Sequence, residues 1–178
     1  MPNLYRSTQT VLRLSILLAI CLLALSAQGC AEGTENRVRD VRVYDGDSFQ
    51  ARMPDGRQVE VRLFGVDAPE RYQAWSARSR EALTGLLRGK EVELEIVDTD
   101  RYERIVARAT LPDGRSVNEW LVEQGHVWVY RHYTDDARLI ALEDAARAEG
   151  RGLWSMPASE RIPPWEWRRQ KRARDSER

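Results

Sequence analysis

Short segments in which apolar and polar residues alternate constrain the fold of this chain more than any other feature. Residues 38–63 show this alternation at Val41 and Val43, and again at Val59, Val61 and Leu63. Two turn sequences separate the alternating runs, Asp-Gly at 45–46 and Pro-Asp-Gly at 54–56. Alternation with a period of two is typical of strands with one buried face, and such turns join antiparallel neighbours. Residues 38–63 therefore predict three short antiparallel strands.

The rest of the chain adds two strands, a shorter β segment and three helices. Residues 91–97 and 105–111 predict the fourth and fifth strands, and residues 126–130 predict the short segment. Residues 75–88 have helical periodicity, Ser116 and Glu119 form a capping box, and Thr134 precedes a third apolar stripe. We therefore predict an α+β fold, a five-stranded OB-fold β-barrel with three helices.

The N-terminal residues indicate export. Residues 1–29 contain two arginines, no acidic residue, and an apolar run of 14 residues at 14–27. A membrane span needs about 20 apolar residues, whereas a shorter run is typical of a signal peptide. The run leads to Ser-Ala-Gln-Gly-Cys at 26–30, which resembles the lipobox of bacterial lipoproteins. An ordinary secretory signal and an uncleaved anchor are the alternatives. We expect an exported cell-envelope lipoprotein anchored to the membrane by a lipid on Cys30, or else a secreted or periplasmic protein.

The two cysteines support this organisation. Cys21 lies inside the apolar run and Cys30 at the expected cleavage site, so no cysteine follows residue 30. The mature fold therefore has no internal disulfide, thiolate metal site or cysteine nucleophile. We expect a signal peptide at 1–29, a tether at 30–37, a folded domain at 38–156, and a Pro-rich basic tail at 157–178.

The charges are segregated along the chain although the formal net charge is zero. Residues 30–160 carry 19 basic and 25 acidic residues, and residues 161–178 carry seven basic and three acidic residues. A zero total does not exclude a nucleic-acid partner, because binding needs local positive groups rather than a basic total. The basic tail is either a solvated disordered end or a segment that binds nucleic acid or anionic lipid.

One stretch carries the side chains that phosphodiester cleavage needs. Residues 61–70 contain Arg62, Asp67 and Glu70, while Asp47 and Arg104 lie in other predicted loops or strand ends. Carboxylates and a backbone carbonyl form the hard oxygen site that Ca²⁺ prefers. The cation neutralises a phosphate oxygen and arginines bind the others, while a further carboxylate takes a proton from water. These residue types therefore favour a phosphodiesterase.

Four motifs in order resemble the staphylococcal nuclease (thermonuclease) family. They are Asp-Gly-Asp-Ser at 45–48, residues 61–70, Asp-Arg-Tyr-Glu-Arg at 100–104, and Gly-Arg-Gly-Leu-Trp at 150–154. The likeness runs from about residue 38 to residue 154, and Pro-Pro-Trp-Glu-Trp-Arg at 163–168 is similar to the tails of some bacterial members. Any one motif is weak by itself, but four in the same order and spacing are specific.

The resemblance implies a role for each matching residue. Asp47 and Asp67 would bind Ca²⁺ through their carboxylates and Ala68 through its backbone carbonyl. Glu70 would be the general base, a role that is debated within the family. The scissile phosphate would be held by Arg62 and Arg104.

The resemblance also implies a substrate surface. Arg101 and Tyr102 would contact a terminal phosphate, and Trp128 and Tyr130 would border the nucleotide, although one of these two aromatic residues can instead belong to the core. Three positions depart from the family pattern, since Ser48 replaces Thr, Trp128 replaces Tyr, and Glu103 stands where glycine is frequent. Glu103 can pair with an arginine and so weaken phosphate binding.

The resulting expectation is a monomeric, Ca²⁺-dependent, sugar-non-specific endonuclease. Family membership would imply hydrolysis of DNA and RNA at the 5′ P–O bond, leaving 3′-phosphate ends. The alternative is a non-catalytic OB-fold module of an envelope lipoprotein that binds nucleic acid or protein.

Overall fold

The computed structural model describes residues 35–177, so the expected signal peptide, the lipidation site Cys30 and most of the tether lie outside the described residues. Five strands form a closed barrel: β1 (Arg37–Val43), β2 (Ser48–Arg52), β3 (Gln58–Leu63), β5 (Val92–Thr99) and β6 (Ile105–Thr110). Their order around the barrel is β1-β2-β3-β6-β5, with only β3 and β6 parallel. The predicted antiparallel β1-β2-β3 meander and the five-stranded barrel are confirmed.

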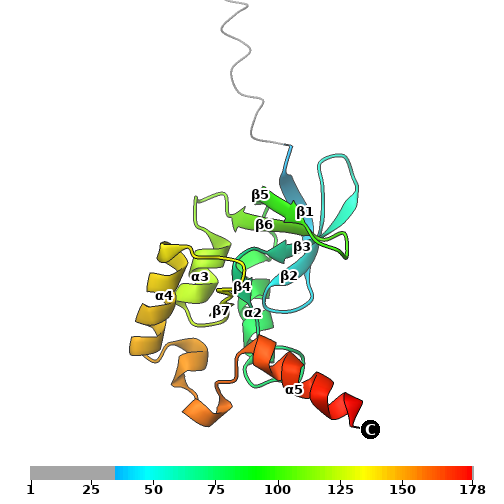
Figure 1. Cartoon of the computed structure of the whole chain (residues 1–178). Coiled ribbons are helices and arrows are strands. Elements are labelled where there is room, and N and C mark those ends of the chain that lie inside the picture. Colours follow the sequence, from blue (N-terminus) through cyan, green and yellow to red (C-terminus); the bar gives the residue numbers. More distant parts are fainter. Residues whose placement is uncertain (1–34, 178) are drawn as a thin grey trace, which may run out of the picture. The chain divides into compact units, whose positions relative to one another are not determined.

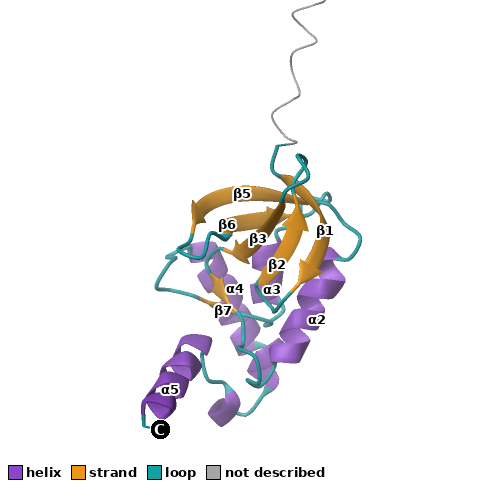
Figure 2. Ribbon diagram, turned by 90° about the vertical axis from the view of Figure 1, so that its right-hand side faces the viewer, coloured by secondary structure: helices purple, strands orange, loops and turns teal. Residues whose placement is uncertain are grey.

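The helices pack around one end of the barrel (Figures 1 and 2). They are α2 (Ser76–Leu87), α3 (Val117–Glu123), α4 (Ala137–Ala148) and α5 (Pro164–Ser176), with short 3₁₀ turns at Gly152–Ser155 and Ala158–Glu160. The N-cap half of the predicted capping box is present, since the Ser116 hydroxyl accepts a hydrogen bond from the Glu119 N–H, while the Glu119 carboxylate accepts from Arg138. Among residues 35–177, no helix is long and apolar enough to cross a membrane.

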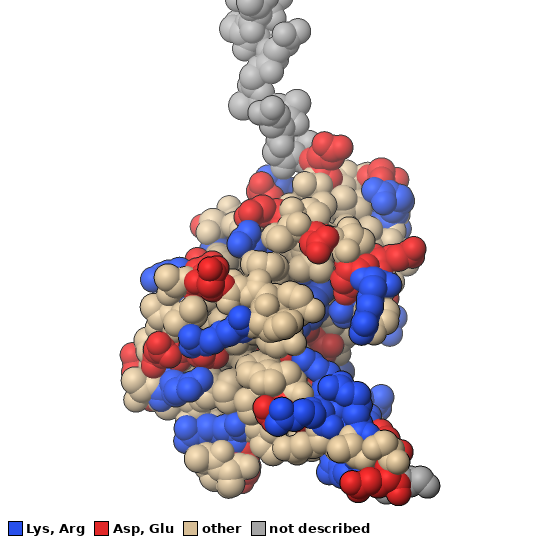
Figure 3. Space-filling model, in the orientation of Figure 1, with Lys and Arg blue, Asp and Glu red and all other residues tan. Residues whose placement is uncertain are grey.

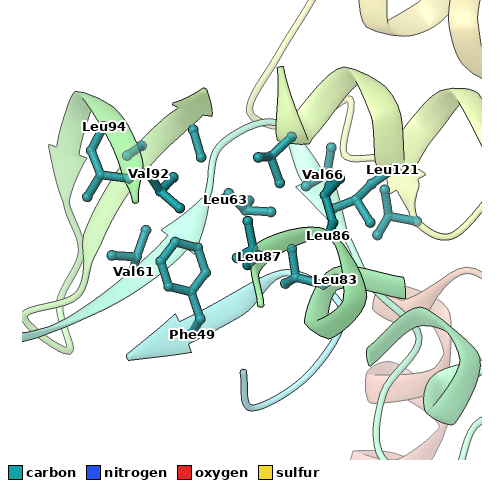
Figure 4. Packing of buried hydrophobic residues seen from close by; sticks show 14 of the residues in the cluster. Phe49, Val61, Leu63, Val66, Leu83, Leu86, Leu87, Val92, Leu94 and Leu121 are labelled. Carbon is teal, nitrogen blue, oxygen red and sulfur yellow. The ribbon is translucent and has the colours of Figure 1, made fainter. Parts of the chain in front are cut away.

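The main core fills the space between the barrel and α2. Phe49, Val61 and Leu63 of the strands point toward Leu83 and Leu87 of α2, as Figure 4 shows, and all five side chains are fully buried. These are the apolar positions of the alternating strands and of the helical stripe. Their burial fixes which face of β3 looks outward, and Arg62 lies on that face.

Two strands of two residues each pair outside the barrel, and the sequence predicted only one of them. β4 (Val66–Asp67) pairs antiparallel with β7 (Trp128–Val129), and Asp67 lies opposite Trp128. The short β segment near residue 128 was expected from its alternation, but β4 is too short to show any period. This ladder holds the backbone of Asp67 against the helical layer.

The C-terminal residues differ from the expectation of an unstructured tail. Residues 164–176 form α5, which begins with Pro164 at its first position and has Glu166 in its first turn. The sequence of this helix has no apolar stripe, and Pro164 is its one buried residue. Its attachment to the domain depends instead on two side chains, Trp165 and Arg168, which are described below.

Gly46 is required by close packing rather than by its backbone angle. A Cβ atom there would lie 1.8 Å from Ser79 Oγ and 2.8 Å from both Ser79 Cβ and Ala68 Cβ.

We expect Gly46→Ala to lower the free energy of unfolding by about 1–3 kcal/mol, because the loop that carries Asp47 must move away from α2. Urea denaturation measures this change. Gly85→Ala is the matched control, since a Cβ atom at this exposed helical position meets nothing within 4 Å. The control is expected to be neutral or to stabilise the protein by up to about 1 kcal/mol, and equal effects of the two substitutions would contradict the packing argument.

Candidate active site

The turn between β1 and β2 presents Asp47 at the end of the barrel. The Asp45 carboxylate accepts hydrogen bonds from the Asp47 N–H at 3.0 Å and from the Ser48 hydroxyl at 2.6 Å. The Asp47 carbonyl accepts from the Leu63 N–H at 2.8 Å, and the Asp47 side chain accepts from the Ala68 N–H. The Asp-Gly-Asp-Ser motif is thus a turn that ties Asp47 to both β3 and the residue after Asp67.

Arg62 joins the two predicted metal-binding carboxylates. Its guanidinium lies 3.1 Å from Asp47 Oδ2 through Nη1 and 3.1 Å from Asp67 Oδ1 through Nη2. The pairing of Ser48 with Arg62 across β2 and β3 puts the arginine beside Asp47. Side chains of Asp47 and Asp67 are only 7% and 2% exposed, so this is a buried ion-pair cluster.

A second guanidinium enters the same cluster from α5. Arg168 Nη2 lies 2.8 Å from Asp67 Oδ2, and Arg168 Nη1 lies 3.1 Å from Asp67 Oδ1 and 2.6 Å from Glu70 Oε1. Residue 168 is about one hundred positions away from both acidic partners, and no sequence pattern pointed to the contact. The available signal was the Pro-Pro pair at 163–164, which is typical of a helix start.

The two arginines do not fully neutralise the negative charge of the carboxylates in this cluster. Burial raises the pKa of Asp47 well above its usual range, and the charge of Arg62 only partly opposes this shift. Burial likewise raises the pKa of Asp67, against the hydrogen bond from Arg168 and the charge of Arg62. Asp47, Asp67 and Glu70 are three acidic groups facing two guanidiniums, so the cluster favours additional positive charge.

The donor set fits a hard divalent cation. Asp47 and Asp67 supply carboxylate oxygens at the same place, which is the chemistry that Ca²⁺ requires. Among residues 35–177, no three His, Cys, Asp or Glu side chains form a ready-made metal cluster. A cation held by these two aspartates would therefore complete its shell with water and backbone carbonyl oxygens, for which Ala68 is the predicted donor.

The predicted arginine Arg104 is held in the loop between β5 and β6. Its Nε and Nη2 atoms lie 2.8 Å and 2.7 Å from Asp100 Oδ2, and within residues 35–177 no ion pair joins it to Asp47, Asp67 or Glu70. Burial would raise the pKa of Asp100, but hydrogen bonds from Arg104 and from the backbone outweigh this effect and lower it. The structure thus brings Arg62 into the carboxylate cluster and leaves Arg104 outside it, at the residue that precedes β6, the strand that pairs with β3.

The predicted phosphate-binding residues Arg101 and Tyr102 lie at the surface of this loop. Tyr102 is 64% exposed, and the Arg101 guanidinium lies 4.9 Å from the centre of its ring. Glu103 has a φ of 64°, a left-handed conformation that explains why glycine suits this position. Glu103 makes no ion pair within the described residues, so the pairing considered for it with an arginine is absent there.

Of the two aromatic residues expected to border the nucleotide, Trp128 is the one that belongs to the core. Trp128 is 8% exposed and packs edge-on against Trp154, at 4.4 Å between ring centres, and against Trp165 at 5.9 Å. It belongs to a second apolar cluster because β7 directs its side chain toward α4 and the following 3₁₀ turn. Tyr130 is half-buried, and one face of its ring stacks on Trp165 at 5.4 Å and 20°.

Comparison with known proteins decides the family. The profile of a family described as staphylococcal nuclease homologue matches residues 60–156. The chain belongs to the staphylococcal nuclease family. Arg62, Asp67, Glu70 and Arg104 lie inside the matched segment, whereas Asp47 and α5 lie outside it.

Individual relatives agree with this assignment. An uncharacterized endonuclease of Escherichia coli is 40% identical over 133 residues, which cover 75% of this chain and 85% of the relative. Protein ParB of Escherichia coli is 35% identical over 182 residues, covering 97% and 98% of the two chains. A micrococcal nuclease of Shigella flexneri is 35% identical over 139 residues, covering 72% and 78%. Family membership places the chain among the nucleases, the hydrolases of phosphodiester bonds.

Proposed function

We propose that this nuclease is a Ca²⁺-dependent endonuclease that hydrolyses both DNA and RNA with little sequence preference. The observation that carries the proposal is the buried cluster in which Arg62 bridges Asp47 and Asp67, with Glu70 at its edge. Phosphate diesters carry one negative charge that grows in the transition state. A site that combines a hard cation with a fixed guanidinium is suited to hold that charge.

Each residue of the cluster has a task in this reaction. Asp47 and Asp67 would hold Ca²⁺, which when bound neutralises a non-bridging phosphate oxygen. Arg62 would bind a further phosphate oxygen through a guanidinium nitrogen, and Arg104 would offer a second guanidinium from the loop that leads into β6. Glu70 would accept a proton from the attacking water, whose oxygen forms the new bond to phosphorus while the 5′ P–O bond breaks and the departing 5′ oxygen takes a proton from solvent. The products would be a 3′-phosphate and a 5′-hydroxyl end.

A tolerant substrate surface is consistent with the exposed residues. Tyr102 offers a flat ring, and Arg101 and Arg104 lie within 4.9 Å and 5.6 Å of its centre. Stacking on an aromatic face discriminates weakly between bases, and guanidiniums bind phosphates of DNA and RNA alike. We therefore propose low selectivity for base and sugar.

Cleavage of an end-labelled single-stranded oligonucleotide tests the proposal. The purified chain is expected to degrade it with Ca²⁺ and to leave it intact with a chelator, and mapping of the ends should find 3′-phosphates. Asp47→Asn should lower the rate about 100-fold or more, since a cation supplies several kcal/mol of charge stabilisation. Equal degradation with chelator would contradict Ca²⁺ dependence. Tight binding without cleavage would favour the non-catalytic module.

Export is part of the proposal on sequence grounds alone. We propose that the enzyme is a monomer, exported and anchored in the cell envelope through a lipid on Cys30, which lies outside the described residues. A nuclease anchored in this way would meet nucleic acid outside the cytoplasm.

A further inference from the structure

The helix α5 lies against the candidate active site through one face. Trp165 and Arg168 are three positions apart, so their side chains project from the same side of the helix. Trp165 stacks on Tyr130, and Arg168 pairs with Asp67 and Glu70. The chain just before α5 is also attached, since the Gln73 side-chain amide donates to the Ile162 carbonyl.

The two contacts cover the groups that a cation and a nucleotide would need. Both carboxylate oxygens of Asp67 accept hydrogen bonds from Arg168, and one of them also accepts from Arg62. Glu70 Oε1 accepts from Arg168 at 2.6 Å, so the expected base is engaged as well. Trp165 occupies one face of Tyr130, the aromatic residue expected to border the nucleotide.

The charge count shows what Arg168 replaces. With Arg168 in place, three carboxylates face two guanidiniums, and without it they face Arg62 alone. Without Arg168 these three carboxylates lack two positive charges, a demand to which the neighbouring Asp45 carboxylate adds and which a divalent cation would meet. Arg168 and Ca²⁺ therefore satisfy the same electrostatic demand and need the same Asp67 oxygens.

The rest of α5 is weakly attached. Pro164 is its one buried residue, and residues 169–177 are exposed. Figure 3 shows basic side chains gathered over the part of the surface that carries this helix. The sequence of α5 itself includes Arg169, Lys171, Arg172 and Arg174. Residues 169–177 therefore add little to the attachment of the helix, which depends on the contacts of Trp165 and Arg168.

We propose that α5 is an autoinhibitory segment of this nuclease, in which Arg168 takes the place of the divalent cation and Trp165 covers Tyr130. Binding of the cation then displaces Arg168 from Asp67 and Glu70 and releases α5 from the site. This inference rests on the proposed function, because it takes the cation-binding role of Asp67 from it. It makes α5, which follows the segment matched by the family model, a regulatory element.

Calorimetric titration of the full chain with Ca²⁺, in the absence of nucleic acid, tests the competition. Arg168→Gln is expected to bind Ca²⁺ about tenfold more tightly than the unaltered chain, because the cation no longer displaces a guanidinium. Arg169→Gln is the matched control, since Arg169 lies on the exposed side of the same helix and pairs with Glu166. Its Ca²⁺ affinity should not change. Equal or weaker binding by Arg168→Gln would overturn the proposal.

Hydrogen exchange of the unaltered chain gives a second measurement that does not depend on a variant. Amide exchange in residues 164–176 should accelerate when Ca²⁺ is added, while exchange in the barrel strands should not. Unchanged or stronger protection of α5 would overturn the proposal even if cleavage is Ca²⁺-dependent. Failure of the proposed function has a different result, namely no cleavage by either the unaltered chain or Arg168→Gln at saturating Ca²⁺.

Discussion

Replacing Arg62 with alanine is expected to lower the cleavage rate by about a thousandfold or more. Arg62 is the residue that links both buried aspartates, and its guanidinium is the one fixed by the barrel itself rather than by a loop or by α5. Loss of that group would remove the proposed phosphate contact at the place where transition-state charge grows. Single-turnover cleavage of a labelled oligonucleotide at saturating Ca²⁺ measures the effect.

The same substitution should also destabilise the protein when no cation is present. It leaves Asp47 and Asp67 buried with one partner fewer, and breaking a buried pair typically costs about 3–5 kcal/mol. Arg57→Ala serves as the control, because Arg57 lies in an exposed hairpin turn and pairs only with the nearby Asp55. This control should keep the normal rate and change stability by less than about 0.5 kcal/mol. A near-normal rate for Arg62→Ala would refute its assigned role.

Glu70→Gln is expected to lower the cleavage rate by about a hundredfold to ten-thousandfold, the range of a lost general base. The amide keeps the shape of the carboxylate and can still accept a hydrogen bond from Arg168, but it cannot take a proton from water. The Glu70 side chain is about one-third exposed, so the fold should be little affected. Measuring the rate together with the thermal midpoint separates the chemical effect from unfolding.

Glu60→Gln is the matched control for Glu70. Glu60 is exposed on β3, two residues from Arg62, and changing it removes the same charge without touching the carboxylate cluster. Its cleavage rate should stay within a factor of about two to three of normal, since screened surface charges act weakly at this distance. If Glu70→Gln retained a rate within tenfold of normal, the base would have to be sought elsewhere in the cluster.

Much of the barrel was predictable because its signals are local. Alternation at Val59, Val61 and Leu63 places three side chains inward and leaves Arg62 on the outer face, whatever else the chain does. The Asp-Gly-Asp-Ser turn and the Ser116–Glu119 capping box are likewise decided by residues within four positions of one another. The site residues Asp47, Arg62, Asp67 and Glu70 were found by their resemblance to a family, and the fold brings them together.

Other features could not be predicted because they depend on contacts between distant residues. The sequence left open whether Trp128 or Tyr130 belongs to the core, and the β4-β7 ladder places Trp128 against Trp154 and Trp165. Arg104 matches the family motif, yet its guanidinium is held by Asp100 instead of the central carboxylates.

The sequence alone determined the barrel and its helical caps, because these follow from alternation and from turn and capping residues close together in the chain. It also determined which acidic and basic residues are available for catalysis, because these lie in family motifs. Only the tertiary structure decided that α5 is a helix attached to the active site. Besides the buried Pro164, its attachment depends on one aromatic ring and one guanidinium that reach partners far away in the chain. Such contacts leave no periodic pattern, because a few strong side-chain interactions hold the helix instead of a buried apolar stripe.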